Sequence, residues 1–196
     1  MSAFRFVTPF FCLFALFAAA ETAQAQISVY GTAALTDYGF FNSSYTLIKS
    51  DSGGFIAGMF YNFPIQSRLT AGIDGRGSYS FGPRGGTSAA VSLRIGFVPE
   101  RVVLRPYFQI GGGFVSSTLT FQQANGDAFQ GLTLRPTRYS SGGAEFVLGL
   151  DIRLTKSFDL RAFELGAIEG GGSGASTGVG SGFANAGVVY HFHQRP

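Results

Sequence analysis

Apolar side chains alternate with polar or small ones along most of the chain after residue 26, and this period of two strongly constrains the fold. In segment 91–97, for example, Val91, Leu93 and Ile95 alternate with Ser92 and Arg94. Successive side chains of a β-strand point to opposite faces, so this pattern predicts two-faced strands. Helical periodicity is scarce in the same region. The sequence therefore predicts an all-β fold.

The spacing of the alternating segments predicts a barrel. Their connections alternate between short ones (63–65, 99–103 and 156–158) and longer ones rich in Gly, Ser, Asn and Asp (37–51, 81–87, 122–138 and 170–181). Short turns at one end and long loops at the other are typical of outer-membrane barrels, whose short turns face the periplasm. We predict an eight-stranded antiparallel up-and-down transmembrane β-barrel. Its strands are expected at 26–36, 52–62, 66–80, 88–98, 104–121, 139–155, 159–169 and 182–193.

Composition indicates which face meets lipid. Charged residues make up 13% of the chain, about half the usual quarter. Phe, Leu and Ile dominate one face, whereas the opposite face carries Gly, Ser and Thr with scattered charges. Small residues and a few paired charges fit the narrow interior of an eight-stranded barrel, which has room only for side chains. The alternative is a soluble periplasmic or secreted barrel, which would need more Lys and Glu on its outer surface.

The net charge of +3 comes almost entirely from arginines spread singly along the chain. Nucleic-acid binding would require a clustered basic patch, so no nucleic-acid partner is expected.

The first 25 residues have the pattern of a secretory signal peptide. Arg5 precedes an apolar run at 6–20, and Ala23 and Ala25 form a small-residue cleavage site. A membrane anchor is disfavoured because a spanning helix needs about 20 apolar residues. Cys12 lies inside the apolar run, so it does not indicate a lipoprotein. We predict a signal peptide at 1–25, a barrel domain at 26–196 and a location in the outer membrane.

Charged residues on the polar face are predicted to fill the barrel interior. Charges removed from water must be paired, so an ion-pair network is expected. A catalytic or gating role for the carboxylates is the alternative. The candidates are Arg68, Asp74, Arg76, Arg94, Glu145, Asp151, Arg153 and Glu164.

The sequence offers little support for enzymatic chemistry. The two histidines, His191 and His193, lie at the end of the last strand and are expected to be polar residues at the barrel rim. They would lie at the periplasmic end, far from the outer leaflet. Two histidines without a nearby third ligand are a weak indication of a metal site. No catalytic residue, metal or cofactor is therefore expected.

The last strand places Val188, Tyr190 and Phe192 on one face. An alternating final strand with a closing aromatic residue resembles the signal that the barrel-assembly machinery recognises, although residues 193–196 follow Phe192 here. With segments 63–69 and 158–166 and the spacing of strands and turns, residues 26–196 resemble the barrel domain of the small OmpA/OmpX-type outer-membrane proteins. The resemblance implies a monomer whose partners are outer-membrane lipids and, during biogenesis, the assembly machinery.

Three functions are compatible with such a barrel. The first is a non-enzymatic outer-membrane protein that acts in envelope integrity or in adhesion through its surface loops. The others are a narrow channel for small solutes and a lipid-modifying enzyme. Aromatic and leucine side chains in two predicted loops are either contact points for a surface ligand or packing residues within the loops. They are Phe40, Phe41, Tyr45 and Leu47 in 37–51, and Phe129, Leu132 and Leu134 in 122–138.

Overall fold

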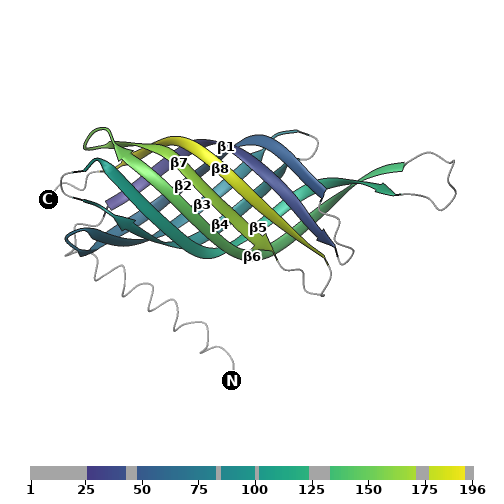
Figure 1. Cartoon of the computed structure of the whole chain (residues 1–196), viewed down its shortest axis with the longest axis horizontal. Coiled ribbons are helices and arrows are strands. Elements are labelled where there is room, and N and C mark those ends of the chain that lie inside the picture. Colours follow the sequence, from purple (N-terminus) through teal and green to yellow (C-terminus); the bar gives the residue numbers. More distant parts are fainter. Residues whose placement is uncertain are drawn as a thin grey trace, which may run out of the picture.

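The computed structural model describes residues 26–42, 48–82, 85–99, 102–123, 133–170 and 177–192. In this part of the chain, eight antiparallel strands follow one another around a closed barrel, and β1 pairs with β8 (Figure 1). The predicted fold class is confirmed. The predicted signal peptide at 1–25 lies outside the described residues. The strands are β1 (Gln26–Asn42), β2 (Ile48–Gln66), β3 (Leu69–Ser80), β4 (Gly86–Phe97), β5 (Leu104–Gln123), β6 (Thr133–Arg153), β7 (Phe158–Gly170) and β8 (Thr177–His191).

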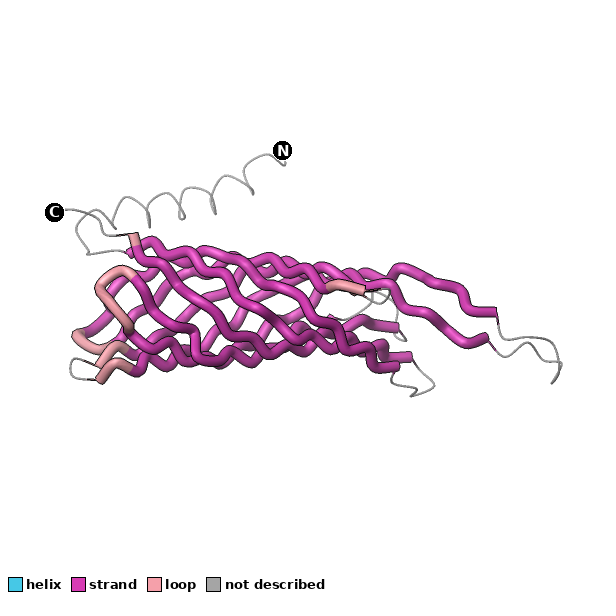
Figure 2. The backbone as a smooth tube through the Cα atoms, turned by 90° about the horizontal axis from the view of Figure 1, so that it is seen from above, coloured by secondary structure: helices cyan, strands magenta, loops and turns pink. Residues whose placement is uncertain are grey.

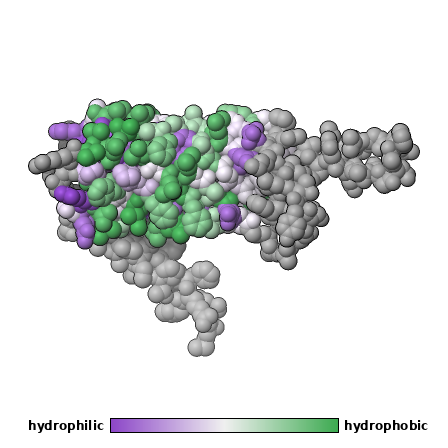
Figure 3. Space-filling view, in the orientation of Figure 1, coloured by the Kyte–Doolittle hydropathy of each residue, from purple (hydrophilic) through white to green (hydrophobic). Residues whose placement is uncertain are grey.

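The outer face of the barrel is apolar. On β4, Val91, Leu93, Ile95 and Phe97 are exposed, whereas the alternate residues are buried in the interior. Figure 3 shows apolar side chains over the middle of the barrel and hydrophilic ones toward its two ends. Within the described ranges, the structure has no helix with the length and hydropathy that a membrane crossing requires.

Aromatic side chains cluster on the outer face at both ends of the barrel. Near the long-loop end, the rings of Tyr79 and Phe81 pack 5.4 Å apart, centre to centre, beside Phe55. Near the short-turn end, the Tyr190 ring packs 5.0 Å from Phe158 and 4.9 Å from Phe192. Aromatic girdles at both interfaces are typical of outer-membrane barrels, so these two clusters mark the borders of the lipid-facing belt.

Exposed charged side chains in the described residues lie at strand ends and turns, outside that belt. Three cations are at the short-turn end and the others are near the long-loop end. This distribution keeps charges out of the hydrocarbon layer, where an arginine or lysine costs about 2–4 kcal/mol. These residues are Arg68, Arg153 and Lys156 at the short-turn end, and Asp51, Arg138 and Glu169 near the long-loop end.

The strands at the long-loop end are longer than the sequence predicts. The predicted loops 37–51 and 122–138 are too long, because β1 continues to Asn42 and β5 to Gln123. Outside lipid, both faces of a strand meet water, and the alternation that reveals a strand disappears. Figures 1 and 2 show the β5–β6 hairpin, teal and green in Figure 1, projecting beyond the other strands.

Because the strands are longer, some of the aromatic and leucine residues predicted in these two loops lie on strands. Phe40 and Phe41 belong to β1 and Leu134 to β6. The remaining four, Tyr45, Leu47, Phe129 and Leu132, lie outside the described residues.

The lipid-facing assignment predicts the effect of a charge in the middle of the belt. Leu93 is 62% exposed and is the middle one of the outward residues of β4. We expect Leu93→Arg to destabilise the barrel by about 2–4 kcal/mol, because the guanidinium must enter hydrocarbon. Denaturant unfolding in phospholipid vesicles measures this cost.

Val102 is a matched control, because it is also exposed and apolar but lies in the short β4–β5 turn. Val102→Arg should cost at most about 1 kcal/mol. Equal losses for the two variants would contradict the lipid-facing assignment of β4.

Candidate functional site

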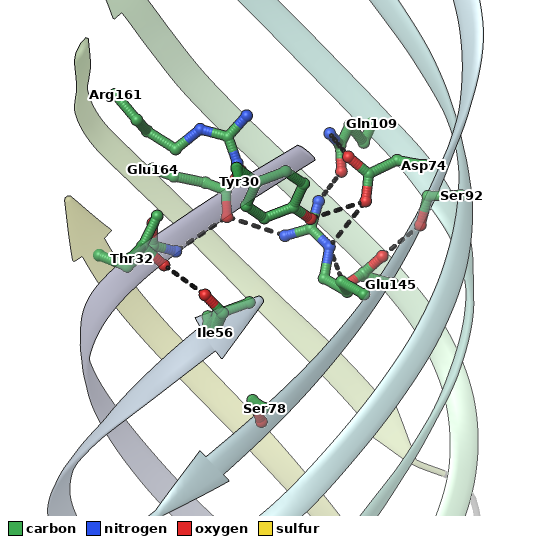
Figure 4. A network of polar contacts seen from close by, with 12 residues as sticks. Tyr30, Thr32, Ile56, Asp74, Ser78, Ser92, Gln109, Glu145, Arg161 and Glu164 are labelled. Atoms are coloured by element: carbon green, nitrogen blue, oxygen red, sulfur yellow. Dashed lines mark hydrogen bonds and ion pairs between the residues drawn. The ribbon is translucent and has the colours of Figure 1, made fainter. Parts of the chain in front are cut away.

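The barrel interior holds a network of buried charged and polar side chains. Six of the eight predicted ion-pair candidates point into it: Asp74, Arg76, Arg94, Glu145, Asp151 and Glu164. Side chains from β1 and from every strand from β3 to β8 take part, so the network crosses the whole section of the barrel (Figure 4).

Arg76 is the centre of this network. Its Nη1 donates to Glu164 Oε1 at 2.8 Å, and its Nε lies 3.3 Å from Asp74 Oδ1 and 3.5 Å from Glu145 Oε1. One guanidinium thus links β3, β6 and β7. The side chains of these four residues are almost fully buried, so each charge depends on the others in place of water.

Neutral side chains donate further hydrogen bonds to these carboxylates. Tyr30 Oη donates to Asp74 Oδ1 at 2.8 Å. Asn185 Nδ2 donates to Glu164 Oε1 at 2.8 Å, and the Tyr107 hydroxyl donates to the other oxygen of the same carboxylate. The Ser92 hydroxyl donates to Glu145. Hydrogen bonds of this kind are what allow carboxylates to remain inside a protein.

A β-bulge brings a second arginine into the network. Between Arg161 and Glu164, β7 holds one residue more than its partner β8, and both side chains therefore point inward. Arg161 Nη1 donates to Glu164 Oε2 at 3.0 Å, and its Nε donates to Asp151 Oδ1 at 3.0 Å. Regular alternation would have placed Arg161 and Glu164 on opposite faces, so the sequence pattern did not indicate an inward position for Arg161.

The network continues toward the short-turn end. Arg94 Nη2 donates to Asp151 Oδ2 at 2.8 Å, and Arg105 Nη1 donates to Asp159 Oδ2 at 2.9 Å. His191 Nε2 lies 2.9 Å from the same oxygen of Asp159. Arg105, Asp159 and His191 were not among the predicted ion-pair candidates.

Aromatic rings pack against the guanidinium groups of two arginines. The guanidinium carbon of Arg94 lies 3.5 Å from the centre of the Tyr107 ring, and that of Arg161 lies 4.1 Å from the Tyr30 ring. Each tyrosine faces a glycine on the neighbouring strand, Gly149 or Gly58, and a Cβ at either glycine would collide with the ring. These glycines leave space for large aromatic residues in a narrow interior.

An apolar layer occupies the interior on the long-loop side of the network. It consists of buried side chains from five strands, with Tyr139 packed against them. The side chains of the charged network and of this layer lie across the interior of the barrel at successive levels. The buried members of the layer are Tyr38, Ala90, Val115, Ile168 and Val179.

Two predicted network members are placed differently. Arg68 lies in the β2–β3 turn and Arg153 at the end of β6, and both are exposed. Arg153 continues the inward phase of β6, but both side chains lie at the end of the barrel, where they reach solvent. The prediction of an interior ion pair is therefore wrong for both residues.

The histidines also differ from the expectation. His191 was expected at the rim, but it is buried inside the barrel, and its Nδ1 lies 2.7 Å from the hydroxyl of Ser28. His193 lies outside the described residues. Within the described ranges, no group of three His, Cys, Asp or Glu side chains has an arrangement that could hold a metal ion.

The predicted assembly-signal residues share the outer face of the barrel. Val188, Tyr190 and Phe192 are all exposed, on β8 and directly after it, and the two rings belong to the aromatic cluster at the short-turn end. Recognition of these residues by the assembly machinery stays a prediction.

No family model matches this chain, and no curated protein matches it at a significant level. Among solved structures, Ail, the attachment invasion locus protein of Yersinia pestis, is 15% identical, with a TM-score of 0.50 over 87% of this chain and 99% of Ail. Neisserial surface protein A is 16% identical, with a TM-score of 0.51 over 86% of this chain and 99% of that protein.

These likenesses establish the class of fold. The chain has the architecture of the small eight-stranded outer-membrane barrels, as the resemblance to the OmpA/OmpX type predicted. The apolar outer face, the aromatic borders and the paired interior charges fit that class, and an outer-membrane location is supported.

The geometry around Arg76 predicts a large loss of stability when this side chain is removed. Arg76→Met leaves Asp74, Glu145 and Glu164 without their shared cation, so we expect the free energy of unfolding to fall by about 3–5 kcal/mol. Denaturant titration in vesicles, with heat-modifiable gel migration as the test of folding, measures the loss.

Two further variants make this result specific. Arg68→Met removes an exposed arginine and should change stability by less than about 0.5 kcal/mol. Adding Glu164→Gln to Arg76→Met removes one unpaired charge and should recover part of the loss. A double variant as unstable as the sum of its two single variants would show that the two residues are not coupled.

Proposed function

We propose that this chain is a non-enzymatic outer-membrane protein that acts through the surface it presents outside the membrane. The barrel serves as an anchor and is closed to solutes. The proposal rests on the filled interior, because the side chains of the Arg76 network and of the apolar layer lie across it. Because these side chains lie across the interior, we place the surface activity on the parts that leave the membrane.

The β5–β6 hairpin is the principal candidate for that activity. Its strands have 20 and 21 residues, whereas a strand needs about 9–11 residues to cross a membrane. The two strands remain paired as far as Gln123 and Thr133. A continuous backbone ladder holds such a projection in position more firmly than an unpaired loop. It is therefore suited to present a binding surface to a partner outside the cell.

The names of the two similar proteins agree with a surface role. One is an attachment and invasion protein, and the other is a surface protein. At 15% and 16% identity, the likeness concerns the fold. Adhesion is therefore our proposal for this chain, and it rests on the projecting hairpin.

The route to the membrane completes the proposal. The signal peptide at 1–25 directs export of the chain. The barrel-assembly machinery then inserts the barrel and recognises the final strand by Val188, Tyr190 and Phe192. The folded protein is a monomer whose immediate partners are outer-membrane lipids. Lipid modification is the weaker alternative, because the described histidine, His191, is engaged with Asp159 and Ser28 at the short-turn end of the interior.

Removing the hairpin tests the adhesive role. A variant in which residues 120–136 are replaced by an Asn-Gly turn keeps the barrel strands and cuts the projection back to the Leu119–Thr137 pair. We expect a Gram-negative host that expresses the unaltered chain to adhere to epithelial monolayers and serum-coated surfaces more strongly than the host alone. A host that expresses the shortened variant should lose this gain. The folded state is checked by heat-modifiable migration.

Excising residues 171–176, the connection between β7 and β8, is the matched control and should leave adherence unchanged. Adherence that survives removal of the hairpin, in protein that has folded, would contradict its role.

Planar-bilayer recording tests the closed interior. We expect no stepwise currents from the reconstituted folded chain, because buried side chains of the Arg76 network and of the layer around Tyr38 lie across the interior. A wide porin recorded under the same conditions controls for insertion. Steady single-channel steps from heat-modifiable protein would favour the alternative function of a narrow channel.

A further inference from the structure

A shallow groove of about 1010 Å³ crosses the lipid-facing surface of the barrel from β2 to β6. Exposed apolar side chains of Met59, Val91 and Phe114 stand beside a floor of small residues. A Cβ on Gly75 would meet no atom within 4 Å, and one on Gly112 would meet a single backbone oxygen at 3.8 Å. The space above the floor of this outer groove is therefore open. The outward floor residues are Ala57, Gly75, Gly77, Ala89 and Gly112.

The outer groove rises toward the long-loop end as it passes from β2 to β6. The row of paired residues through Gly31 of β1 reaches β6 at Gly142 when it is followed through β2, β3, β4 and β5. Followed the other way, through β8 and β7, the same row reaches β6 at Ile152. Because β6 begins at the long-loop end, Gly142 lies nearer to that end than Ile152 does. The row that contains the floor residues Ala57 and Gly77 therefore climbs toward the outside, as the tilt of strands in a closed barrel requires.

Arg138 lies at the upper end of the outer groove. In register it pairs with Thr118, but its Nε donates to Ser116 Oγ at 2.8 Å. On the outer face of β5, Ser116 is the next position after Phe114, which lines the groove. This hydrogen bond therefore directs the exposed guanidinium back along the strands toward the groove. Its two terminal nitrogens have no partner in the described part of the chain.

The position of the outer groove determines what it can hold. It lies on the face that meets lipid, so acyl chains reach it directly from the membrane. Within hydrocarbon, association depends on van der Waals contact, and small residues allow a close approach to the backbone. A flexible acyl chain can make such contacts along the whole floor.

The guanidinium at the upper end adds a requirement for charge. An arginine with free terminal nitrogens can donate two parallel hydrogen bonds to a phosphate group. At the long-loop end this places a phosphate at the level of the outer-leaflet headgroups, above a chain that runs down the groove. We therefore propose that the outer groove binds one acyl chain of an outer-leaflet lipid whose headgroup ends in a phosphate monoester, with that phosphate on Arg138.

A nearby acidic residue does not neutralise this arginine. Glu169 is exposed on β7, and its register partner on β6 is Ala144, six positions farther along the chain than Arg138. No ion pair joins the two charges among the described residues. The lipid site is also independent of adhesion, because shortening the hairpin at 120–136 leaves Arg138 in place.

Tryptophan fluorescence tests the proposal, because the chain contains no tryptophan. Met59→Trp introduces one fluorophore at the lower end of the groove, and Leu165→Trp introduces one on the outer face of β7, away from the groove. Each folded chain is reconstituted in phosphatidylcholine vesicles. Quenching by phosphatidic acid with brominated chains is compared with quenching by phosphatidylcholine brominated at the same carbons, so the depth of the fluorophore cancels.

We expect the Met59→Trp chain to prefer phosphatidic acid roughly fivefold, the effect of one arginine near anionic lipid. The Leu165→Trp chain should show no preference.

Three variants of the Met59→Trp chain separate the groove from the headgroup site. Arg138→Gln removes the cation and should abolish the preference. Gly112→Leu fills the floor between the two ends of the groove and should abolish it as well. Gly182→Leu is the matched control, because its Cβ also has open space but lies on β8, and it should leave the preference unchanged. Heat-modifiable migration checks that each variant has folded.

Three outcomes would overturn the proposal. Equal quenching of the Met59→Trp chain by the two lipids would mean that ordinary lipid covers the groove. A preference that survives Gly112→Leu but not Arg138→Gln would mean that the arginine attracts anionic lipid without a bound chain. If neither lipid quenches Met59→Trp while both quench Leu165→Trp, a second copy of the chain covers the groove.

Discussion

Every backbone N–H and C=O group that enters the hydrocarbon layer must find a partner within the protein, and the structure depends on this constraint. Pairing of β1 with β8 closes the sheet and leaves no open edge. Closure also gives each strand one face toward lipid and one toward a narrow interior. The outward row Val91, Leu93, Ile95 and Phe97 of β4 follows directly from this division.

The interior of the closed barrel imposes a second requirement. Its inward faces carry charges, and a buried charge is tolerated when it is paired and hydrogen-bonded. Arg76 meets this requirement for three carboxylates on three strands, and Arg161 links that group to Asp151 and the short-turn end. The same paired side chains lie across the interior, so the projecting β5–β6 hairpin is the part of the described structure on which we place a binding role.

Much of the fold and part of the site could be predicted from the sequence. Alternation located the eight strands, and residues such as Arg76 and Glu145 were placed correctly because they lie on regular strands between lipid and interior. Prediction failed where that regularity ends. The bulge beside Glu164 changes the phase of β7 and concealed Arg161, whereas the exposed positions of Arg68 and Arg153 depend on where the barrel stops.

The sequence by itself determined the architecture, because alternation, low charge content and turn spacing are local properties that a lipid-facing sheet must have. Only the tertiary structure decided which charges meet and how far the β5–β6 ladder extends. These features depend on contacts between strands that are remote in the chain, such as the contact between Arg76 and Glu164, which are 88 positions apart. Closure of the barrel fixes those contacts, and no local pattern encodes them.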